Sequence, residues 1–203
     1  MSFAKTLLST GSLRVNVANP FRWTSGILSP IYVDCRVVIG FPKERRIIAD
    51  GLEAIIEKNI GIKNIDVIAG GVTAGIPMAS ILAERLNKPL AYVRKEPKDH
   101  GRGQQVEGAD VAGKRVLLFD ELISRGSSVT QFCPALRDAG AQVDHLLVMM
   151  SYDSIEVRNA AKDCGVQLHA LMTLDQVLVA TELSEADRAE VARFRANPPA
   201  WRT

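Results

Sequence analysis

Short apolar segments alternate with amphipathic helical segments from about residue 43 onward, and this alternation constrains the fold more than any other feature of the chain. Strands are predicted at 65–69, 90–93, 115–119, 143–151 and 166–171. Helices are predicted at 43–59, 74–87 and 128–139. Strands that alternate with helices form βαβ units, whose strands lie parallel in one sheet with right-handed crossovers. The sequence therefore predicts an α/β fold with a central parallel sheet flanked by helices.

The length and the distribution of turn residues indicate one domain with three parts. A chain of 203 residues is typical of a single domain. Residues 1–40 form a loop-rich lead-in, with a short helix expected at 3–9 and a short strand at 31–33. Residues 41–175 form the α/β core. Residues 176–203 form a helical tail, whose helix is expected to begin after a capping box at Ser184.

Charge, cysteine content and hydropathy exclude several classes of protein. The 25 basic and 23 acidic residues leave a net charge of +2, which gives no electrostatic basis for binding nucleic acid or an anionic membrane. Cys35, Cys133 and Cys164 are widely spaced and odd in number, so we expect reduced thiols and a cytoplasmic protein. The apolar runs are shorter than the roughly 18 residues that a membrane span needs, and we expect no signal peptide.

Two acidic residues leave the strand predicted at 115–119, and a run of small residues follows them. Asp120 and Glu121 come first, and the segment 124–128 then opens a helix. The backbone N–H groups and hydroxyls of this segment can wrap a phosphate, whose charge the helix dipole favours. The two carboxylates suit sugar hydroxyls or a metal-bound water instead. An ordinary strand–helix turn with a capping serine is the alternative that composition leaves open.

Two further predicted strands are followed by segments that suit an anion. Residues 70–77 are a glycine-rich turn before a helix, although they lack the phosphate-loop and dinucleotide fingerprints. Residues 94–103 begin a long loop, predicted to reach residue 113, and carry cationic groups that neutralise phosphates. Close strand–helix packing and a solvated loop are the respective alternatives. Because these strand ends meet at one edge of a parallel sheet, the three segments together predict a ligand with a sugar and more than one phosphate.

Four segments together resemble the orotate phosphoribosyltransferases, which have the type I phosphoribosyltransferase fold. The string RKEPKDHGRGQQVEG at 94–108 is similar to the catalytic loop of that family, and FRWTSGILSPIYVDCR at 21–36 to its base-binding segment. VLLFDELISRGSS at 116–128 is similar to the type I signature, and GGVTAGIP at 70–77 to the pyrophosphate-side loop. The resemblance covers about residues 21–153 in order and spacing.

The resemblance implies a fold, a reaction and an assembly. The fold is a type I phosphoribosyltransferase-like sheet flanked by helices, with a small N-terminal hood over the base. The reaction joins orotate to the 5-phosphoribosyl group of 5-phosphoribosyl 1-pyrophosphate (PRPP), giving orotidine 5′-monophosphate and pyrophosphate in pyrimidine biosynthesis. Mg²⁺ is implied as the cofactor, held through the substrate's pyrophosphate and water and not directly by the protein. A homodimer is implied in which the catalytic loop acts on the neighbouring subunit's site.

Residues that match the family's motif positions receive roles by the same resemblance. The catalytic residues would be Lys98, His100, Asp120 and Glu121. PRPP would be bound by Arg94, Lys95, Lys98, His100, Asp120, Glu121, Leu122, Ile123, Ser124, Arg125, Gly126, Ser127 and Ser128. Orotate would be bound by Ser124, Ser25, Gly26 and Tyr32.

Several positions depart from the family pattern. Glu121 stands where Asp is usual, Arg125 where Thr, Ala or Asp is usual, and Leu28 where a Lys commonly precedes the Ser-Pro pair. Ser154 stands where some members carry the Arg that contacts the orotate carboxylate. These departures leave two alternatives open. One is a phosphoribosyltransferase that acts on another base, and the other is a non-catalytic regulator that senses PRPP.

Overall fold

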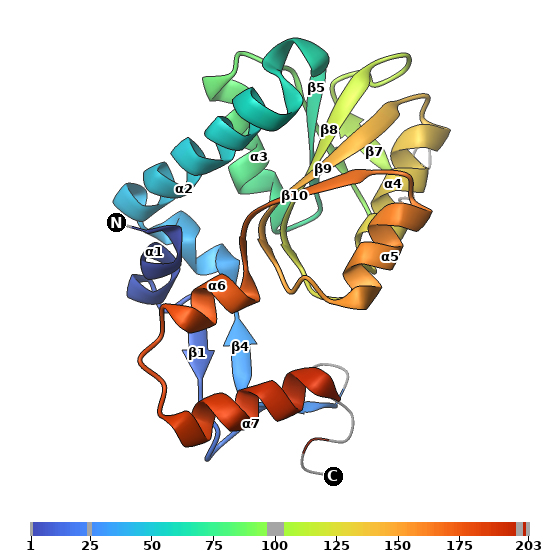
Figure 1. Cartoon of the computed structure of the whole chain (residues 1–203). Coiled ribbons are helices and arrows are strands. Elements are labelled where there is room, and N and C mark those ends of the chain that lie inside the picture. Colours follow the sequence, from blue (N-terminus) through green and yellow to red (C-terminus); the bar gives the residue numbers. More distant parts are fainter. Residues whose placement is uncertain (1, 24–25, 97–103, 198–200, 202–203) are drawn as a thin grey trace.

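A six-stranded sheet forms the centre of the computed structural model, which describes residues 2–23, 26–96, 104–197 and 201. The strand order is β10-β9-β8-β5-β6-β7 (Figure 1). The strands are β5 (Val67–Gly71), β6 (Leu90–Val93), β7 (Val106–Gly108), β8 (Arg115–Ile123), β9 (Gln142–Ser151) and β10 (Gln167–Thr173). All neighbouring pairs are parallel except β6 and β7, which are antiparallel. The predicted α/β sheet is confirmed.

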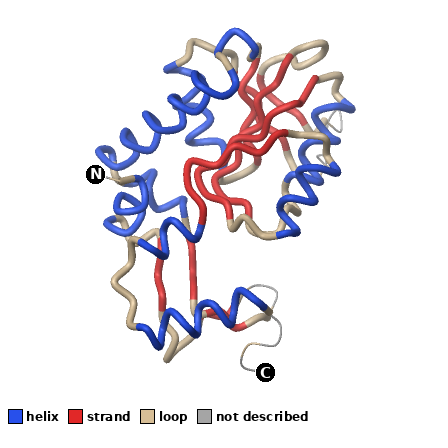
Figure 2. Tube along the Cα trace, viewed as in Figure 1, coloured by secondary structure: helices blue, strands red, loops and turns tan. Residues whose placement is uncertain are grey.

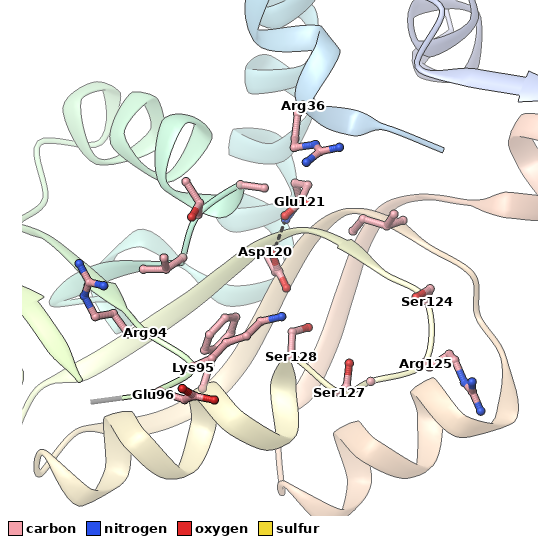
Figure 3. Close-up of a pocket in the computed structure, with 16 residues that line it drawn as sticks. Arg36, Arg94, Lys95, Glu96, Asp120, Glu121, Ser124, Arg125, Ser127 and Ser128 are labelled. Carbon is pink, nitrogen blue, oxygen red and sulfur yellow. Dashed lines mark hydrogen bonds between the residues drawn. The ribbon is translucent and has the colours of Figure 1, made fainter. Parts of the chain in front are cut away.

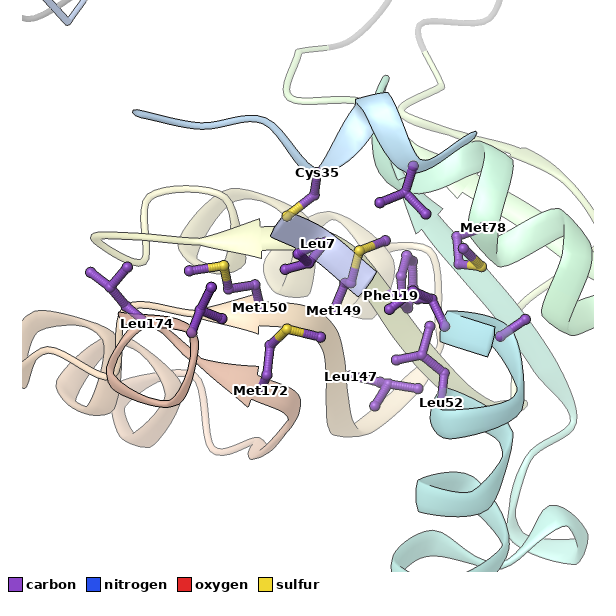
Figure 4. Packing of buried hydrophobic residues seen from close by; sticks show 14 of the residues in the cluster. Leu7, Cys35, Leu52, Met78, Phe119, Leu147, Met149, Met150, Met172 and Leu174 are labelled. Carbon is purple, nitrogen blue, oxygen red and sulfur yellow. The ribbon is translucent and has the colours of Figure 1, made fainter. Parts of the chain in front are cut away.

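Helices cover both faces of this sheet (Figure 2). The helices α2 (Pro42–Ile55) and α3 (Gly75–Arg85) pack on one face, and α4 (Val129–Asp138) and α5 (Ile155–Asp163) on the other. Side chains alternate along each strand, so Phe119 enters the first core cluster and its neighbour Leu118 enters the second. Figure 4 shows Phe119 beside Leu52 and Leu147 in the first cluster. Burial on both faces explains why these strands read as continuous apolar runs.

The lead-in and the tail lie together at one end of the sheet. The lead-in consists of α1 (Phe3–Ser9), the hairpin strands β1 (Leu13–Val15) and β4 (Ile31–Val33), the pair β2 (Phe21–Arg22) and β3 (Leu28–Ser29), and the turn η1 (Cys35–Gly40). The tail consists of α6 (Leu174–Val179) and α7 (Glu185–Ala196), and Figure 1 shows α7 beside the lead-in strands. We call the lead-in together with α7 the hood.

An aromatic chain joins the two parts of the hood. The Phe194 ring on α7 meets Trp23 edge-on at 5.5 Å between ring centroids, and Trp201 edge-on at 5.7 Å. Trp23 also lies 6.3 Å from Tyr152, which follows β9. Edge-to-face aromatic pairs add to the free energy gained from burial. These aromatic contacts therefore join α7 to the segment that the resemblance predicts to bind the base.

The structure corrects several predicted elements. The strand predicted at 115–119 continues to Ile123, because β9 pairs with it through the register Ile123↔Ser151. The loop predicted over 94–113 contains β7, which the exposed edge of β6 recruits through backbone pairing. The helices α5 and α6 and the strands β1 to β3 were not predicted, because each is short and buries few residues. Among the described residues, every helix is too short or too polar to cross a bilayer.

Candidate active site

A cavity of about 1050 Å³ opens at the carboxyl ends of β5, β6 and β8, where the sequence predicted a ligand (Figure 3). The strand-end loops bring together three groups: two carboxylates, a run of small hydroxyl residues and several cations. The lining residues are Arg36, Val72, Thr73, Ala74, Arg94, Lys95, Glu96, Asp120, Glu121, Leu122, Ser124, Arg125, Gly126, Ser127, Ser128 and Phe132. The three strand ends therefore contribute to one site.

The two carboxylates occupy the last part of β8 and lie at the centre of the cavity. Asp120 is only 7 % exposed, and its Oδ1 accepts the backbone N–H of Glu121 at 2.9 Å. The helix α3 begins directly beside Asp120, because Gly75 has no side chain there. A Cβ on Gly75 would lie 2.9 Å from the Phe119 carbonyl oxygen and 3.6 Å from Asp120 Oδ1. The close strand–helix packing considered as an alternative for residues 70–77 is thus real, and it also shapes the site.

Glu121 is placed where its carboxyl group favours the neutral form. Burial, followed by the hydrogen bond and the negative charge of Asp120, raises the pKa of Glu121 to about 8. The Arg36 guanidinium works in the opposite direction and lowers this pKa. Figure 3 shows Arg36 on one side of Glu121 and Asp120 on the other. The charge of the acid pair therefore depends on the cations that approach it.

The run of small residues forms a turn between β8 and α4. Gly126 has φ of +86°, and a Cβ there would lie 2.4 Å from the Cβ of Ala160 on α5. Only glycine fits this turn, which aims residues 124–128 and the start of α4 at the cavity. Ser128 makes no hydrogen bond that caps α4, so its hydroxyl remains available to a ligand. Hydroxyls and backbone N–H groups at a helix start can hold a phosphate.

Cations enter the cavity from the β6 side. Arg94 Nε donates to Glu107 Oε1 at 2.7 Å, and Tyr92 donates to the other oxygen of Glu107 at 3.2 Å. The hydrogen bond from Arg94 to Glu107 anchors the start of the loop that follows β6. Figure 3 shows the Lys95 side chain extending from the same loop toward the acid pair. The arrangement places positive charge next to Asp120 and Glu121.

Not every predicted site residue reaches this cavity. Ser25, Lys98 and His100 lie outside the described residues, so their predicted roles remain predictions. Ile123 is buried in the core, and Gly26 and Tyr32 are not among the lining residues. Figure 3 shows Arg125 directed away from the acid pair, toward α5. There it lowers the pKa of Glu156, after the larger effects of Ser154 and the Glu156 backbone.

Sequence reasoning missed Arg36, Thr73 and Phe132, which all line the cavity. Arg36 is the last residue of the string at 21–36 that carried the resemblance, so a signal was present. Thr73 lies in the glycine-rich turn, which also carried a signal. Phe132 is an apolar helix residue, and nothing in its sequence context marks it as part of a site.

The carboxylates fit a role near a hard cation. Carboxylate oxygens are ligands that Mg²⁺ prefers, usually together with water and substrate phosphates. Across the described ranges, no three His, Cys, Asp or Glu side chains cluster closely enough to cage a metal. Asp120 and Glu121 alone therefore suit a cation that arrives with a phosphorylated substrate.

Comparisons with known proteins agree with one another. The phosphoribosyl transferase domain model matches residues 42–167. Orotate phosphoribosyltransferases of Roseobacter denitrificans and Sinorhizobium medicae are 40% and 42% identical to the chain over 203 residues. These matches cover 98% of this chain and 90% and 88% of those proteins.

Solved structures resemble most of the chain as well. Orotate phosphoribosyltransferase from Aeropyrum pernix has a TM-score of 0.73 at 27% identity, covering 88% of this chain and 97% of that one. The structure of Leishmania donovani UMP synthase has a TM-score of 0.79 at 27% identity, covering 96% of this chain and 41% of that one.

The raised pKa of Glu121 predicts a pH-dependent stability. Because its folded pKa of about 8 exceeds the ordinary value of 4.5, this group's stabilising contribution is complete below about 4.5 and is lost as pH rises to about 8. Glu121→Gln imitates the protonated form and removes this loss. We expect the variant to melt at least about 3 °C above the parent at pH 8, with the difference vanishing near pH 4.5 in thermal denaturation.

Glu156→Gln is the matched control, because the Ser154 hydroxyl lowers the pKa of Glu156 instead of raising it. That variant should gain no stability at high pH. Parallel pH profiles for Glu121→Gln and the parent would contradict the prediction, since they would show that folding does not shift the pKa of Glu121.

Proposed function

The chain belongs to the orotate phosphoribosyltransferase family, and from this premise we propose that it transfers the 5-phosphoribosyl group of PRPP to orotate. The products are orotidine 5′-monophosphate and pyrophosphate, a step of pyrimidine biosynthesis. One observation carries the proposal: an acid pair with buried Asp120, a turn of small hydroxyl residues and several cations line the same cavity. A phosphorylated sugar with a pyrophosphate leaving group needs all three.

The turn after β8 supports a role in holding the 5-phosphate. Residues 124–128 offer hydroxyls and N–H groups beside the start of α4, whose dipole favours an anion. Gly126 fixes this turn against α5. A phosphate held there would place the ribose over the end of β8, because the acid pair precedes the turn by only a few residues.

The acid pair suits the ribose and the charge that develops on it. Carboxylates accept hydrogen bonds from the two ribose hydroxyls, which orients the sugar. In the reaction the bond from C1 to the pyrophosphate oxygen breaks and a bond from C1 to a ring nitrogen of orotate forms. The proton on that nitrogen is released to the departing pyrophosphate or to water. Positive charge develops on the ribose during this exchange, and it would be stabilised by Asp120, together with Glu121 once nearby cations favour its ionised form.

Cations at the β6 side suit the departing pyrophosphate. Arg94 and Lys95 stand at the start of the loop, and we propose that Lys98 and His100 complete the set. Mg²⁺ bound through the pyrophosphate and water would neutralise further charge on the leaving group. Asp120 and Glu121 are the residues that would hold its water shell.

The free cysteines Cys35, Cys133 and Cys164 suit the cytoplasm, which we propose as the location.

Orotate consumption, followed by its ultraviolet absorbance, tests the proposed function. We expect loss of orotate that requires the protein, PRPP and Mg²⁺ together. Uracil, adenine and hypoxanthine serve as matched bases. Turnover of another base with orotate unchanged would favour a phosphoribosyltransferase of different specificity. PRPP binding without turnover of any base would favour a regulator.

We further propose a homodimer in which the loop that carries Lys98 acts on the partner's site. Mixing Lys98→Ala with Asp120→Asn subunits tests this arrangement. Each mixed dimer would contain one site with an intact loop and an intact acid pair. Activity should then recover to about a quarter of the parent value, since about half of the dimers are mixed and each has one working site. No recovery after verified subunit exchange would contradict a loop that acts in trans.

A further inference from the structure

The base that the proposed function assigns to this site is an anion, and its binding poses an electrostatic problem. Orotate carries a carboxylate and must approach the ribose directly beside Asp120 and Glu121. Like charges at such distances repel strongly where water is excluded. A cation must therefore face the carboxylate from a direction that the ribose and its phosphates do not occupy.

The described cations that line the cavity divide into three groups by position. Arg94 and Lys95 enter from the end of β6, where the pyrophosphate is proposed to lie. Arg125 is directed away from the acid pair, toward α5 (Figure 3). Arg36 lies on the opposite side of Glu121 from Asp120, and it comes from the hood. Within the described part of the chain, Arg36 is the one lining cation on the hood side.

The turn η1 holds Arg36 in a defined place. Cys35 is buried in the core with 1 % exposure, so the residues on either side of it are directed outward. Arg36 Nε donates to Asp34 Oδ1 at 2.7 Å, and Arg36 Nη2 donates to Asp34 Oδ2 at 2.8 Å. The Arg36 backbone N–H also donates to Asp34 Oδ1, at 3.1 Å. Asp34 thus fixes both the backbone and the guanidinium of Arg36.

This pairing uses only one edge of the guanidinium. An arginine has five N–H donors, and Asp34 occupies one on Nε and one on Nη2. The end-on edge remains, formed by Nη1 and the second hydrogen of Nη2. That edge matches the spacing of a second carboxylate and can bind it through two parallel hydrogen bonds. Because the Arg36 side chain is 62% exposed, a ligand can reach it.

We propose that Arg36 binds the carboxylate of the pyrimidine base and so determines base specificity, with Asp34 as its positioning residue. The proposal rests on the proposed function. It also accounts for the position of Arg36 beside Glu121, since the guanidinium then lies between two carboxyl groups and reduces their repulsion. Arg158, the nearest arginine in sequence to Ser154, pairs with Asp153 at 2.9 Å and is not among the lining residues.

Two nucleotides that differ only in the carboxylate isolate the contact. Orotidine 5′-monophosphate and uridine 5′-monophosphate share the phosphate, the ribose and the ring, so the ratio of their dissociation constants reports the carboxylate alone. Isothermal titration with Arg36→Gln should reduce the parent's preference for orotidine 5′-monophosphate at least about tenfold. The affinity for uridine 5′-monophosphate should stay within about twofold, because its base offers Arg36 no carboxylate.

Three further variants sharpen the test. Arg36→Lys keeps the charge without the two-pronged geometry and should lose part of the preference. Asp34→Asn weakens the anchor and should lose part of it as well. Arg14→Gln removes a cation from β1 that does not line the cavity, and it should keep the full preference.

The possible outcomes separate the proposal from the proposed function. An unchanged nucleotide ratio in Arg36→Gln, with the parent still converting orotate, overturns the role of Arg36 alone. An equal loss of affinity for both nucleotides also overturns it, because Arg36 would then act only on Glu121. A parent protein that neither converts orotate nor prefers orotidine 5′-monophosphate overturns the proposed function itself.

Discussion

The burial of Asp120 beside Glu121 at the end of β8 is the constraint on which the rest of the site depends. Two adjacent carboxyl groups in a partly buried place cannot both ionise at low cost, and the raised pKa of Glu121 expresses this. The surrounding structure moderates the cost in specific ways. Gly75 lets α3 begin against Asp120, Arg36 approaches Glu121 from the hood, and Lys95 approaches from β6.

This constraint gives the cavity two sides with different chemistry. On one side, the turn 124–128 and the loop after β6 offer N–H groups, hydroxyls and cations that suit phosphates. On the other side, the hood offers one guanidinium held by Asp34. The aromatic contact between Trp23 and Phe194 joins the two parts of the hood, the lead-in and α7. The tail is therefore part of the structure that supports the base side, although none of its described residues lines the cavity.

Sequence reasoning predicted most of the fold because the central strands are buried on both faces. Their apolar runs are unmistakable, and the long amphipathic helices between them follow from the same pattern. The prediction failed where burial is sparse. The strand β8 was ended too early because Asp120 and Glu121 are polar, although backbone pairing with β9 continues past them. The helix α5 was missed because it buries only Val157, Ala160 and Ala161.

The residues of the candidate site also fall into those that the sequence predicted and those that only the structure shows. The acid pair and the turn 124–128 were predicted because residue type and position after a strand both point to a ligand. Arg36 lies in a string that carried the resemblance, but its place in the cavity depends on the packing of the hood, which residue type and spacing do not show. Gly75 lies in a glycine-rich motif that the sequence shows. Its close approach to Asp120, however, is a contact between distant parts of the chain. Contacts of this kind require the structure.

A crystal structure of the protein with orotidine 5′-monophosphate tests the two-sided cavity most directly. We expect the phosphate within residues 124–128, the ribose hydroxyls against Asp120 and Glu121, and the base carboxylate on Arg36. A nucleotide bound in the reverse direction, or outside this cavity, would contradict it.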